Sequence, residues 1–326
     1  MRAYPSTVFI YDGPGSDPIC RKDAYELFEA HGIFERPNVC FSNFQHIRNQ
    51  RLNPSETLMV YPGGTAMAMG DDEYNASVEA RELFSQGAHG AGFCAGGFYI
   101  PDEHRLYSAT HRVIDVMRDD ELTSTLSPPQ NSAGNSQYFN SLKLCEDYAA
   151  IGPFYPDPEY YLSRLHQNDP DCTPKTLLNA GNRKPYVTSL TFNNNSVLNA
   201  IYVGGPAFIP KTEGTTQVVA HYPERDYLFH DKVSPVDPTI SQHTFRLPAA
   251  IISRRPYPTT GRGGLFLSGP HVEACVPNSG IHRFFTTRGA GRISLSDEKI
   301  ALLERDRSEM LETVVQHFNE TFRFTP

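Results

Sequence analysis

The positions best suited to chemistry surround one cysteine, in the run Gly92-Phe93-Cys94-Ala95-Gly96-Gly97. Small residues two places before and two places after a nucleophile are typical of a sharp turn from a strand into a helix, because larger side chains would clash there. Such a turn projects the thiol above the sheet, beside the N-terminus of the following helix, which favours the thiolate. The pattern therefore predicts a nucleophilic Cys94. The alternative is a buried structural cysteine, the usual interpretation of an isolated cysteine.

A cysteine nucleophile needs a base and a group that orients the base. The candidates are His271 and Glu273, which follow the apolar run 265–267 and the turn Ser268-Gly269-Pro270. This position is the predicted exit of a strand. A histidine after a strand is often only a hydrogen-bonded structural residue, so its candidacy depends on the combination with Cys94.

The first hundred residues must position the cysteine, and they alternate between short apolar runs and helical stretches. This alternation is typical of a parallel sheet covered by helices. Strands are predicted at 8–11, 39–41, 58–61 and 90–93, and helices around 24–28 and 75–85. Three of these strands end in glycine-rich turns, at Asp12-Gly13-Pro14-Gly15, Gly63-Gly64 and Cys94 to Gly97. Ligands bind at the carboxyl ends of parallel strands, although each turn can also be an ordinary connection.

The remainder of the chain predicts further strands at 186–192, 200–203, 217–221, 249–253 and 264–267. The polar stretches 102–137 and 156–184 are interpreted as insertions over the core. The chain ends in a helix predicted at about 295–320, with Ser294-x-x-Asp297 as its capping start. We therefore expect a single domain over residues 1–326.

Composition excludes several classes of function. The formal net charge is −8, from 37 acidic and 29 basic residues, so no basic field would gather the phosphates of nucleic acid or an anionic membrane. We expect a small-molecule ligand, and the sequence indicates no particular protein partner. No run is apolar enough for a signal peptide or a membrane span, so we expect a cytoplasmic protein. The six cysteines show no Cys-x-x-Cys pair and no histidine stands in a metal-ligand pattern, so we expect free thiols, no metal and no cofactor.

Several motifs together carry a resemblance to a known family. They are Val60-Tyr61-Pro62-Gly63-Gly64, Gly92 to Tyr99, Ile151-Gly152-Pro153-Phe154, Tyr202-Val203-Gly204-Gly205 and Leu267 to Glu273. The set resembles the biotin-protein ligase N-terminal domain family, over roughly residues 7 to 275. That family is similar in fold to class I glutamine amidotransferases, which place a His-x-Glu pair far downstream of a turn-borne cysteine. The resemblance implies a flavodoxin-like, mostly parallel sheet with helices on both faces, carrying loop and β insertions.

The resemblance also implies roles for individual residues. Cys94 is then the nucleophile, His271 the general base and Glu273 the carboxylate that orients it. The backbone amides of Ala95 and of Gly63 or Gly64 would hold the oxyanion. Weaker substrate-binding candidates are Asp12, Gly13, Tyr202 and Gly205.

This chain departs from the family in two respects. Val272 stands between the histidine and the glutamate, where the family commonly has proline. The chain also has no biotin-ligase half, since Gly261-Arg262-Gly263-Gly264 only superficially echoes a ligase motif, so biotin transfer is not expected.

The sequence leaves alternative functions open. The first is a thiol-dependent hydrolase or amidotransferase-like enzyme that acts on an amide or related acyl bond. The second is a non-catalytic ligand-binding or regulatory module with a vestigial triad, which an unactivated Cys94 would favour. A third is a relative of the PfpI-like proteins, which usually place their histidine soon after the cysteine, where this chain has Ala95-Gly96-Gly97.

Overall fold

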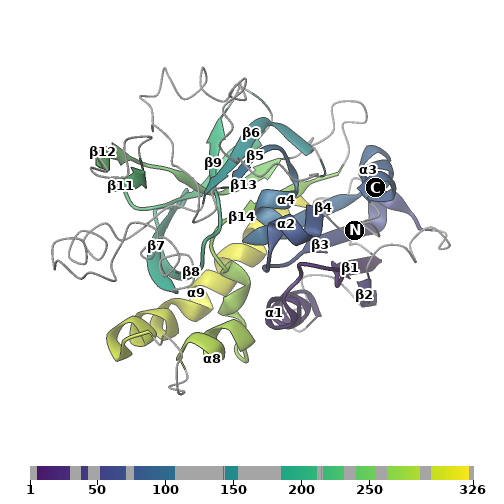
Figure 1. Ribbon diagram of the computed structural model, residues 1–326. Helices are drawn as coiled ribbons and strands as arrows, with labels where there is room; N and C mark the ends of the chain where they lie inside the picture. The colour runs from purple at the N-terminus through teal and green to yellow at the C-terminus, as the bar shows by residue number, and fades with distance from the viewer. Residues whose placement is uncertain are drawn as a thin grey trace.

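Figure 1 shows the computed structural model of the chain as a mixed α/β fold. The structure describes residues 6–29, 38–42, 52–70, 77–106, 142, 144–152, 185–210, 214, 216–230, 240–253, 263–286 and 295–322. Most of the two predicted polar insertions lies outside these residues. So do Pro153-Phe154 of the family motif and Ser294.

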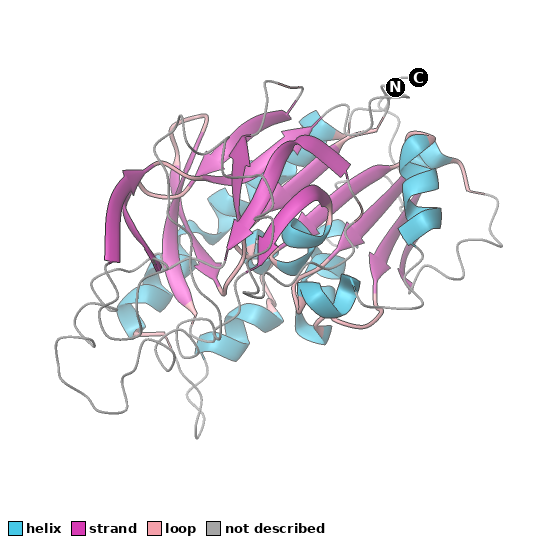
Figure 2. Cartoon of the chain, turned by 45° about the horizontal axis from the view of Figure 1, so that its top comes forward, coloured by secondary structure: helices cyan, strands magenta, loops and turns pink. Residues whose placement is uncertain are grey.

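The described strands form one large sheet and two small ones. The nine strands of the large sheet lie in the order β2-β1-β3-β4-β14-β13-β10-β7-β8. Their bounds are β1 Thr7–Tyr11, β2 Asn38–Ser42, β3 Thr57–Tyr61, β4 His89–Phe93, β7 Tyr186–Phe192, β8 Val197–Tyr202, β10 Thr216–His221, β13 Pro248–Ser253 and β14 Leu265–Ser268. Figure 2 shows these strands with helices packed around them.

The large sheet has a parallel half and an antiparallel half. Strands β2, β1, β3, β4 and β14 pair in parallel, whereas β14, β13, β10, β7 and β8 pair antiparallel. The mostly parallel sheet expected from the sequence therefore describes only the half built largely by the N-terminal strands. The alternation of strands and helices that indicates parallel pairing ends near residue 100, so nothing in the later strands specified their direction.

Helices cover both faces of the parallel half. Alternate residues of β1 point to opposite faces, as the pleat requires. Val8 and Ile10 pack in a core with α1 (Pro18–Glu29) and α9 (Asp297–Thr321). Phe9 and Tyr11 pack in a second core with α2 (Ala66–Gly70), α3 (Ser77–Ser85) and α4 (Ala95–Tyr99). In Figure 1, α2 and α4 accordingly lie over β3 and β4, and α9 passes behind β14.

The strands of the two small sheets are not predicted by the sequence patterns. One sheet has the order β5-β6-β9, with β5 Pro101–Leu106, β6 Leu144–Gly152 and β9 Ala207–Pro210. The other pairs β11 (Arg225–His230) with β12 (Ile240–Phe245). β5 reads Pro-Asp-Glu-His-Arg-Leu and β12 reads Ile-Ser-Gln-His-Thr-Phe, too polar to predict as core strands. Their partners are distant in the chain or across long connections, which a local pattern does not reveal.

Two short 3₁₀ turns and two helices complete the described elements. They are η2 (Pro54–Glu56), η3 (Val272–Cys275), α8 (Gly280–Thr286) and the long α9. The predicted C-terminal helix is confirmed, but its N-cap is Ser296, whose Oγ accepts a hydrogen bond from the Lys299 amide at 3.4 Å. The cap therefore lies two residues after Ser294, the residue that the sequence pattern favoured.

Candidate active site

Cys94 lies in the turn between β4 and α4, as the sequence predicts. Its backbone has φ 49° and ψ −104°, a conformation that non-glycine residues rarely adopt. The Cys94 amide donates to the Ser268 carbonyl at 2.9 Å, which ties this turn to the end of the neighbouring strand β14. The side chain is only 5% exposed. The cysteine is thus held in a strained conformation by hydrogen bonding to the adjacent strand.

The glycines around Cys94 allow the turn to close. A Cβ atom at Gly92 would lie 2.7 Å from the Gly96 carbonyl oxygen, and one at Gly96 would collide with the Tyr61 carbonyl oxygen of β3. Real Cβ atoms do not approach other atoms as closely as a Cβ atom at either glycine would. The structure therefore confirms the physical reason for small residues on each side of the cysteine.

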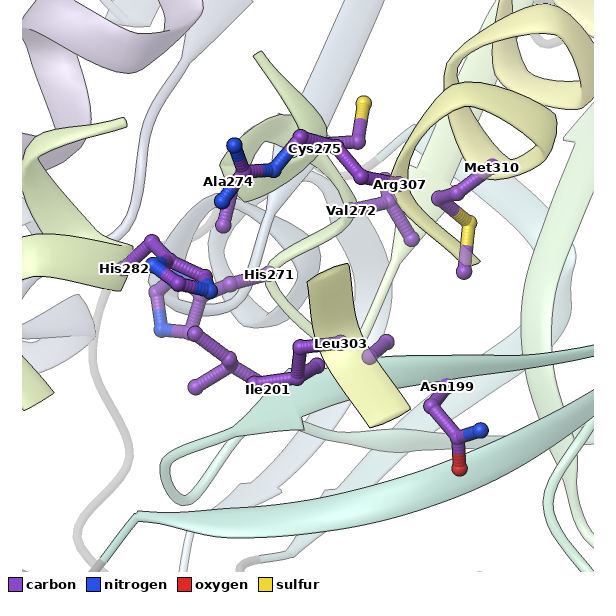
Figure 3. Close-up of a pocket in the computed structure, with 11 residues that line it drawn as sticks. Asn199, Ile201, His271, Val272, Ala274, Cys275, His282, Leu303, Arg307 and Met310 are labelled. Carbon is purple, nitrogen blue, oxygen red and sulfur yellow. The ribbon is translucent and has the colours of Figure 1, made fainter. Parts of the chain in front are cut away.

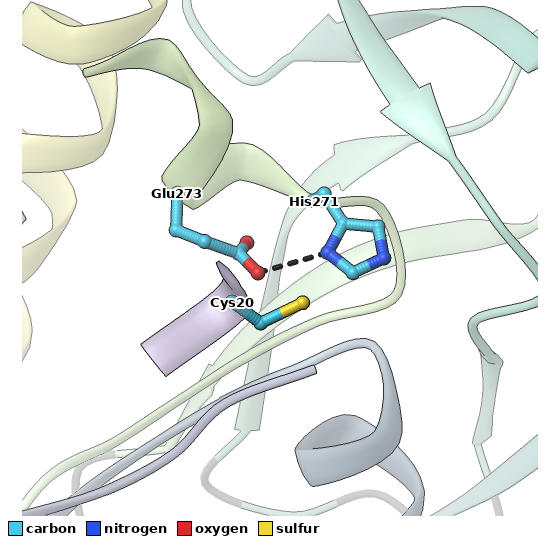
Figure 4. A group of neighbouring side chains, drawn as sticks. All are labelled: Cys20, His271 and Glu273. Carbon is cyan, nitrogen blue, oxygen red and sulfur yellow. Dashed lines mark hydrogen bonds and ion pairs between the residues drawn. The ribbon is translucent and has the colours of Figure 1, made fainter. Parts of the chain in front are cut away.

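His271 and Glu273 form a buried pair just beyond β14. The imidazole Nδ1 lies 2.9 Å from Glu273 Oε1, and the side chains are 5% and 0% exposed. In Figure 4 the carboxylate approaches Nδ1, while the other ring nitrogen, Nε2, points away from Glu273. Glu273 reaches the ring because it lies in η3, which begins directly after His271. This arrangement fixes the tautomer with the proton on Nδ1 and leaves Nε2 as an acceptor.

The sheet brings Cys94 and His271 to the same edge. Phe93 pairs with Ser268 where β4 and β14 lie side by side in parallel, so the residues that follow them emerge together. Burial lowers the pKa of His271, but the charges of Cys94 and Glu273 outweigh it and raise the pKa well above its ordinary value. Cys94 makes the largest of these favourable contributions. The fold therefore brings two groups predicted from distant parts of the sequence to one edge of the sheet.

The end of strand β8 and the residue after it contact His271 and Cys94, which the sequence did not predict. The Ile201 carbonyl accepts a hydrogen bond from the His271 amide at 2.8 Å. The Val203 carbonyl accepts one from the Cys94 thiol, with Sγ 3.7 Å away. These contacts are made by backbone atoms, so no side-chain pattern in the sequence marks them.

A second thiol, that of Cys20, also lies beside His271. Cys20 is in the first turn of α1, whose N-cap is Asp17, the acceptor for the Ile19 and Cys20 amides. Burial raises the pKa of Cys20 to about 12, despite a hydrogen bond with His271. Its Sγ, one nitrogen of His271 and a carboxylate oxygen of Glu273 all lie within 4.8 Å of one another. Cys20 has no flanking glycine pattern, so no sequence signal marked it.

The candidate oxyanion residues lie next to this site. The Ala95 amide opens α4, where the first N–H groups of a helix have no intrahelical acceptor. Gly63 lies against His271 and Cys20, since a Cβ atom there would be 2.6 Å from His271 Cε1 and 2.8 Å from Cys20 Sγ. Gly64 has φ 150° and forms an isolated bridge with Ser16.

The weaker candidates have local partners instead. Asp12 forms an ion pair with Arg21 at 3.5 Å, and Gly13 lies against the ring of Tyr11. The buried Tyr202 hydroxyl donates to the Gly205 carbonyl at 2.9 Å. Gly205 approaches the Gly269 carbonyl so closely that a Cβ atom would collide with it. Tyr202 and Gly205 thus support the turn that leads to His271.

Figure 3 shows a small cavity on another side of His271, between β8, η3, α8 and α9. Its volume is about 20 Å³, room for about one water molecule. Its polar lining includes His282 and Arg307, and both side chains contact Glu304, at 3.3 Å and 2.5 Å. The cavity is too small for a substrate.

Among the described residues, none of the helices combines the length and the apolar character needed to cross a membrane.

No protein-family model and no curated protein matches the chain. Solved structures with a similar arrangement include a glutamine amidotransferase, at 12% identity and a TM-score of 0.43, over 86% of this chain and 96% of that chain. PurLQS from Thermotoga maritima matches at 11% identity and a TM-score of 0.40, over 98% and 100%. A ThuA-like protein from Bacteroides uniformis matches at 9% identity and a TM-score of 0.37, over 95% and 93%. At these TM-scores the likeness identifies no family.

Proposed function

We propose that the chain is a thiol-dependent hydrolase or amidotransferase-like enzyme, which acts on an amide or related acyl bond of a small molecule. One observation carries the proposal. A cysteine with φ 49° lies in a glycine-flanked turn, at the strand edge that it shares with a buried His271–Glu273 pair. Backbone strain clusters at functional sites, and a base oriented by a third group is a signature of nucleophilic catalysis.

The proposed reaction proceeds in two halves. His271 Nε2 takes the proton of the Cys94 thiol, and the thiolate attacks the carbonyl carbon to form a tetrahedral intermediate. The intermediate collapses to a thioester, and the leaving amine receives the proton from His271. Water then attacks the thioester, again losing a proton to His271, and the acid and the thiol are released. Glu273 holds the imidazole in the tautomer that this sequence needs.

Backbone amides are proposed to stabilise the negative oxygen of each intermediate. The Ala95 amide follows the nucleophile directly, and the amide of Gly63 or Gly64 comes from the end of β3. Such donors are effective because they are fixed before the reaction begins.

We also propose that the chain is a relative of the biotin-protein ligase N-terminal domain family, with a class I glutamine amidotransferase-like fold. The support is local: the cysteine turn and the His-x-Glu segment occur together at one edge of a partly parallel sheet. Biotin transfer is not part of the proposal.

The first test compares the parent chain with Cys94→Ala and with Cys275→Ser. Cys275 is a matched control because it is another buried thiol close to Glu273, and burial raises its pKa. The parent and Cys275→Ser are expected to react with a small thiol-directed electrophile at position 94 and to release ammonia from at least one member of an amide panel that includes glutamine. Cys94→Ala is expected to lose both properties.

The same experiment separates catalysis from ligand binding without chemistry. If Cys94→Ala and the parent show equal labelling and equal turnover, the enzymatic proposal is wrong. Alkylation of Cys94 that is no faster than that of a free thiol, across the pH range, would instead favour a binding module with a vestigial triad.

A further inference from the structure

The side chains of Cys20, His271 and Glu273 converge on one point, although they come from opposite ends of the chain. Their sulfur, nitrogen and oxygen donor atoms lie within 4.8 Å of one another, and the residues are 7%, 5% and 0% exposed. Figure 4 shows the Cys20 sulfur and the Glu273 carboxylate approaching the same side of the imidazole, that of Nδ1. A catalytic triad uses two of these groups and has no use for a second thiol there.

A further observation at this point indicates a ligand. Glu273 Oε2 is buried and has no hydrogen-bond partner among the described residues. An unpaired buried carboxylate oxygen is costly, and a cation would satisfy it. Gly63 contributes no side chain, and a Cβ atom at this position would come within 2.8 Å of Cys20 Sγ. A larger residue at position 63 would therefore push the thiol out of its present place beside His271.

The kinds of donor specify the class of cation. A thiolate, an imidazole and a carboxylate together suit Zn²⁺, which binds them at about 2.0–2.3 Å with tetrahedral geometry. Donor atoms around such an ion lie about 3.3–3.8 Å apart. Nδ1 and Oε1, now 2.9 Å apart, would separate slightly, and Cys20 Sγ, within 4.8 Å of the other donors, would move inward by about 1 Å at most.

Charge also favours a divalent ion. Coordination removes the proton from the Cys20 thiol and displaces the proton from His271 Nδ1, so one thiolate and one carboxylate balance the two charges of the ion. The resulting buried cluster is neutral.

We propose that Cys20, His271 Nδ1 and Glu273 bind one thiophilic divalent cation such as Zn²⁺, and that this ion reversibly silences the base. Coordination through Nδ1 leaves the neutral imidazole with its proton on Nε2. That nitrogen can no longer accept the proton of Cys94. The bound ion also takes the Glu273 carboxylate away from its role in orienting the ring. Binding does not depend on the proposed function, whereas the inhibition does.

The test measures binding directly on the full chain after chelator treatment. Zn²⁺ is titrated in competition with a chromophoric chelator, and Co²⁺ is titrated while the thiolate-to-Co²⁺ charge-transfer absorption is recorded. The parent is expected to bind one ion and to show this absorption. Cys20→Ser is expected to lose the absorption and to bind Zn²⁺ at least about tenfold more weakly. Glu273→Gln is expected to weaken Zn²⁺ binding by a similar factor.

Two other cysteine variants keep the interpretation specific. Cys275→Ser leaves the ligand set intact and is expected to behave as the parent does. Cys94→Ala is expected to retain the ion and its absorption, because Cys94 is not in the ligand set. Circular dichroism melting curves check that each variant is folded, and Cys20→Ala replaces Cys20→Ser if the latter is not.

Each contrary result overturns a definite statement. Absence of binding by the folded parent, or unchanged binding by the folded Cys20 variants, overturns the site. Loss of the charge-transfer absorption in Cys94→Ala, with retention in Cys20→Ser, shows that the wrong thiol was assigned. Ion binding by a parent that turns over no amide leaves the site standing and removes only the proposed function.

Discussion

At the scale of single residues, Cys94 combines an unfavourable backbone conformation with a position at the same sheet edge as His271. A non-glycine residue at positive φ costs about 1–3 kcal/mol, and it persists because its surroundings fix it. Here the surroundings are the Ser268 carbonyl, which holds the Cys94 amide, and the tightly packed glycines 92 and 96. The strain is thus a property of the position and not of the thiol.

This strain predicts an inverted order of stability at position 94. Cys94→Gly is expected to be more stable than Cys94→Ala by up to about 1 kcal/mol, because glycine adopts positive φ without a Cβ penalty. Urea unfolding of the two variants measures the difference. At the neighbouring position Ala95, in α4, replacement by glycine is expected to show the usual loss of about 1 kcal/mol. Equal stability of Cys94→Ala and Cys94→Gly contradicts the strained conformation.

At the scale of elements, α1 positions the site through a contact far from its thiol. Asp23 on α1 is fully buried and accepts hydrogen bonds from the Ser279 hydroxyl at 2.5 Å and from the Gly280 and Ile281 amides at 2.6 Å and 3.1 Å. It therefore caps the first turn of α8 from another helix. Burial raises the pKa of Asp23 to about 6, against the effect of these hydrogen bonds. The contact joins the helix that carries Cys20 to the segment that follows η3 and Glu273.

Removal of this link is expected to destabilise the protein. Asp23→Ala leaves three donors without their acceptor and is expected to lower the free energy of unfolding by about 2 kcal/mol or more. Glu26→Gln is the matched control on the same helix, because it disrupts only the exposed ion pair with Lys22 and should change stability by less than about 0.5 kcal/mol. Urea unfolding at constant pH measures both. Equal effects of the two substitutions contradict the role of Asp23.

At the scale of the whole molecule, the site depends on a sheet that changes direction. The parallel strands β3, β4 and β14 supply the edge where Gly63, Cys94 and His271 emerge. The antiparallel strands return β8 to that edge, where the Ile201 carbonyl accepts a hydrogen bond from the His271 backbone amide. Val203, the residue after β8, accepts one from the Cys94 thiol. Both the parallel and the antiparallel half of the sheet therefore contribute contacts to the candidate site.

The contact of α9 with the parallel half predicts a pH dependence of global stability. His89 opens β4 and packs edge-on against Phe322 after α9, with ring centroids 5.5 Å apart. Burial lowers the pKa of His89 to about 4. Folding therefore favours the neutral ring. The contribution of His89 to the free energy of unfolding is fully present above the unfolded pKa of about 6.5 and is lost as the pH falls towards 4.

The difference between the folded and unfolded pKa of His89 corresponds to a loss of at most about 3 kcal/mol in the free energy of unfolding. His89→Leu removes the titrating group, so its free energy of unfolding is expected to fall less than that of the parent between about pH 7.5 and about pH 4.5. Denaturant unfolding at both pH values measures how far the free energy of unfolding falls in each protein. An equal fall in the variant and the parent would show that His89 does not titrate in this way.

The sequence predicted the elements whose residues follow a local pattern. The apolar strands 8–11 and 58–61, the glycine-flanked turn at Cys94 and the C-terminal helix are found near their predicted positions. The direction of the later strands and the existence of β5 and β12 were not predictable, because polar strands and pairing between distant segments leave no local period. The placement of Cys20 beside His271 was not predictable for the same reason, because only the tertiary fold brings α1 close to η3.

The separation of Cys94 from His271 along the chain has a consequence for synthesis of the protein. A nascent polypeptide that already exposes β4 lacks the strand β14 that pairs with it in parallel. Until that strand and η3 leave the ribosome, the thiol has neither its base nor the carbonyl that fixes its backbone. Under the proposed function, fragments that end before residue 271 are expected to react slowly at position 94. Rapid labelling of this thiol would then distinguish completed, folded chains from shorter ones.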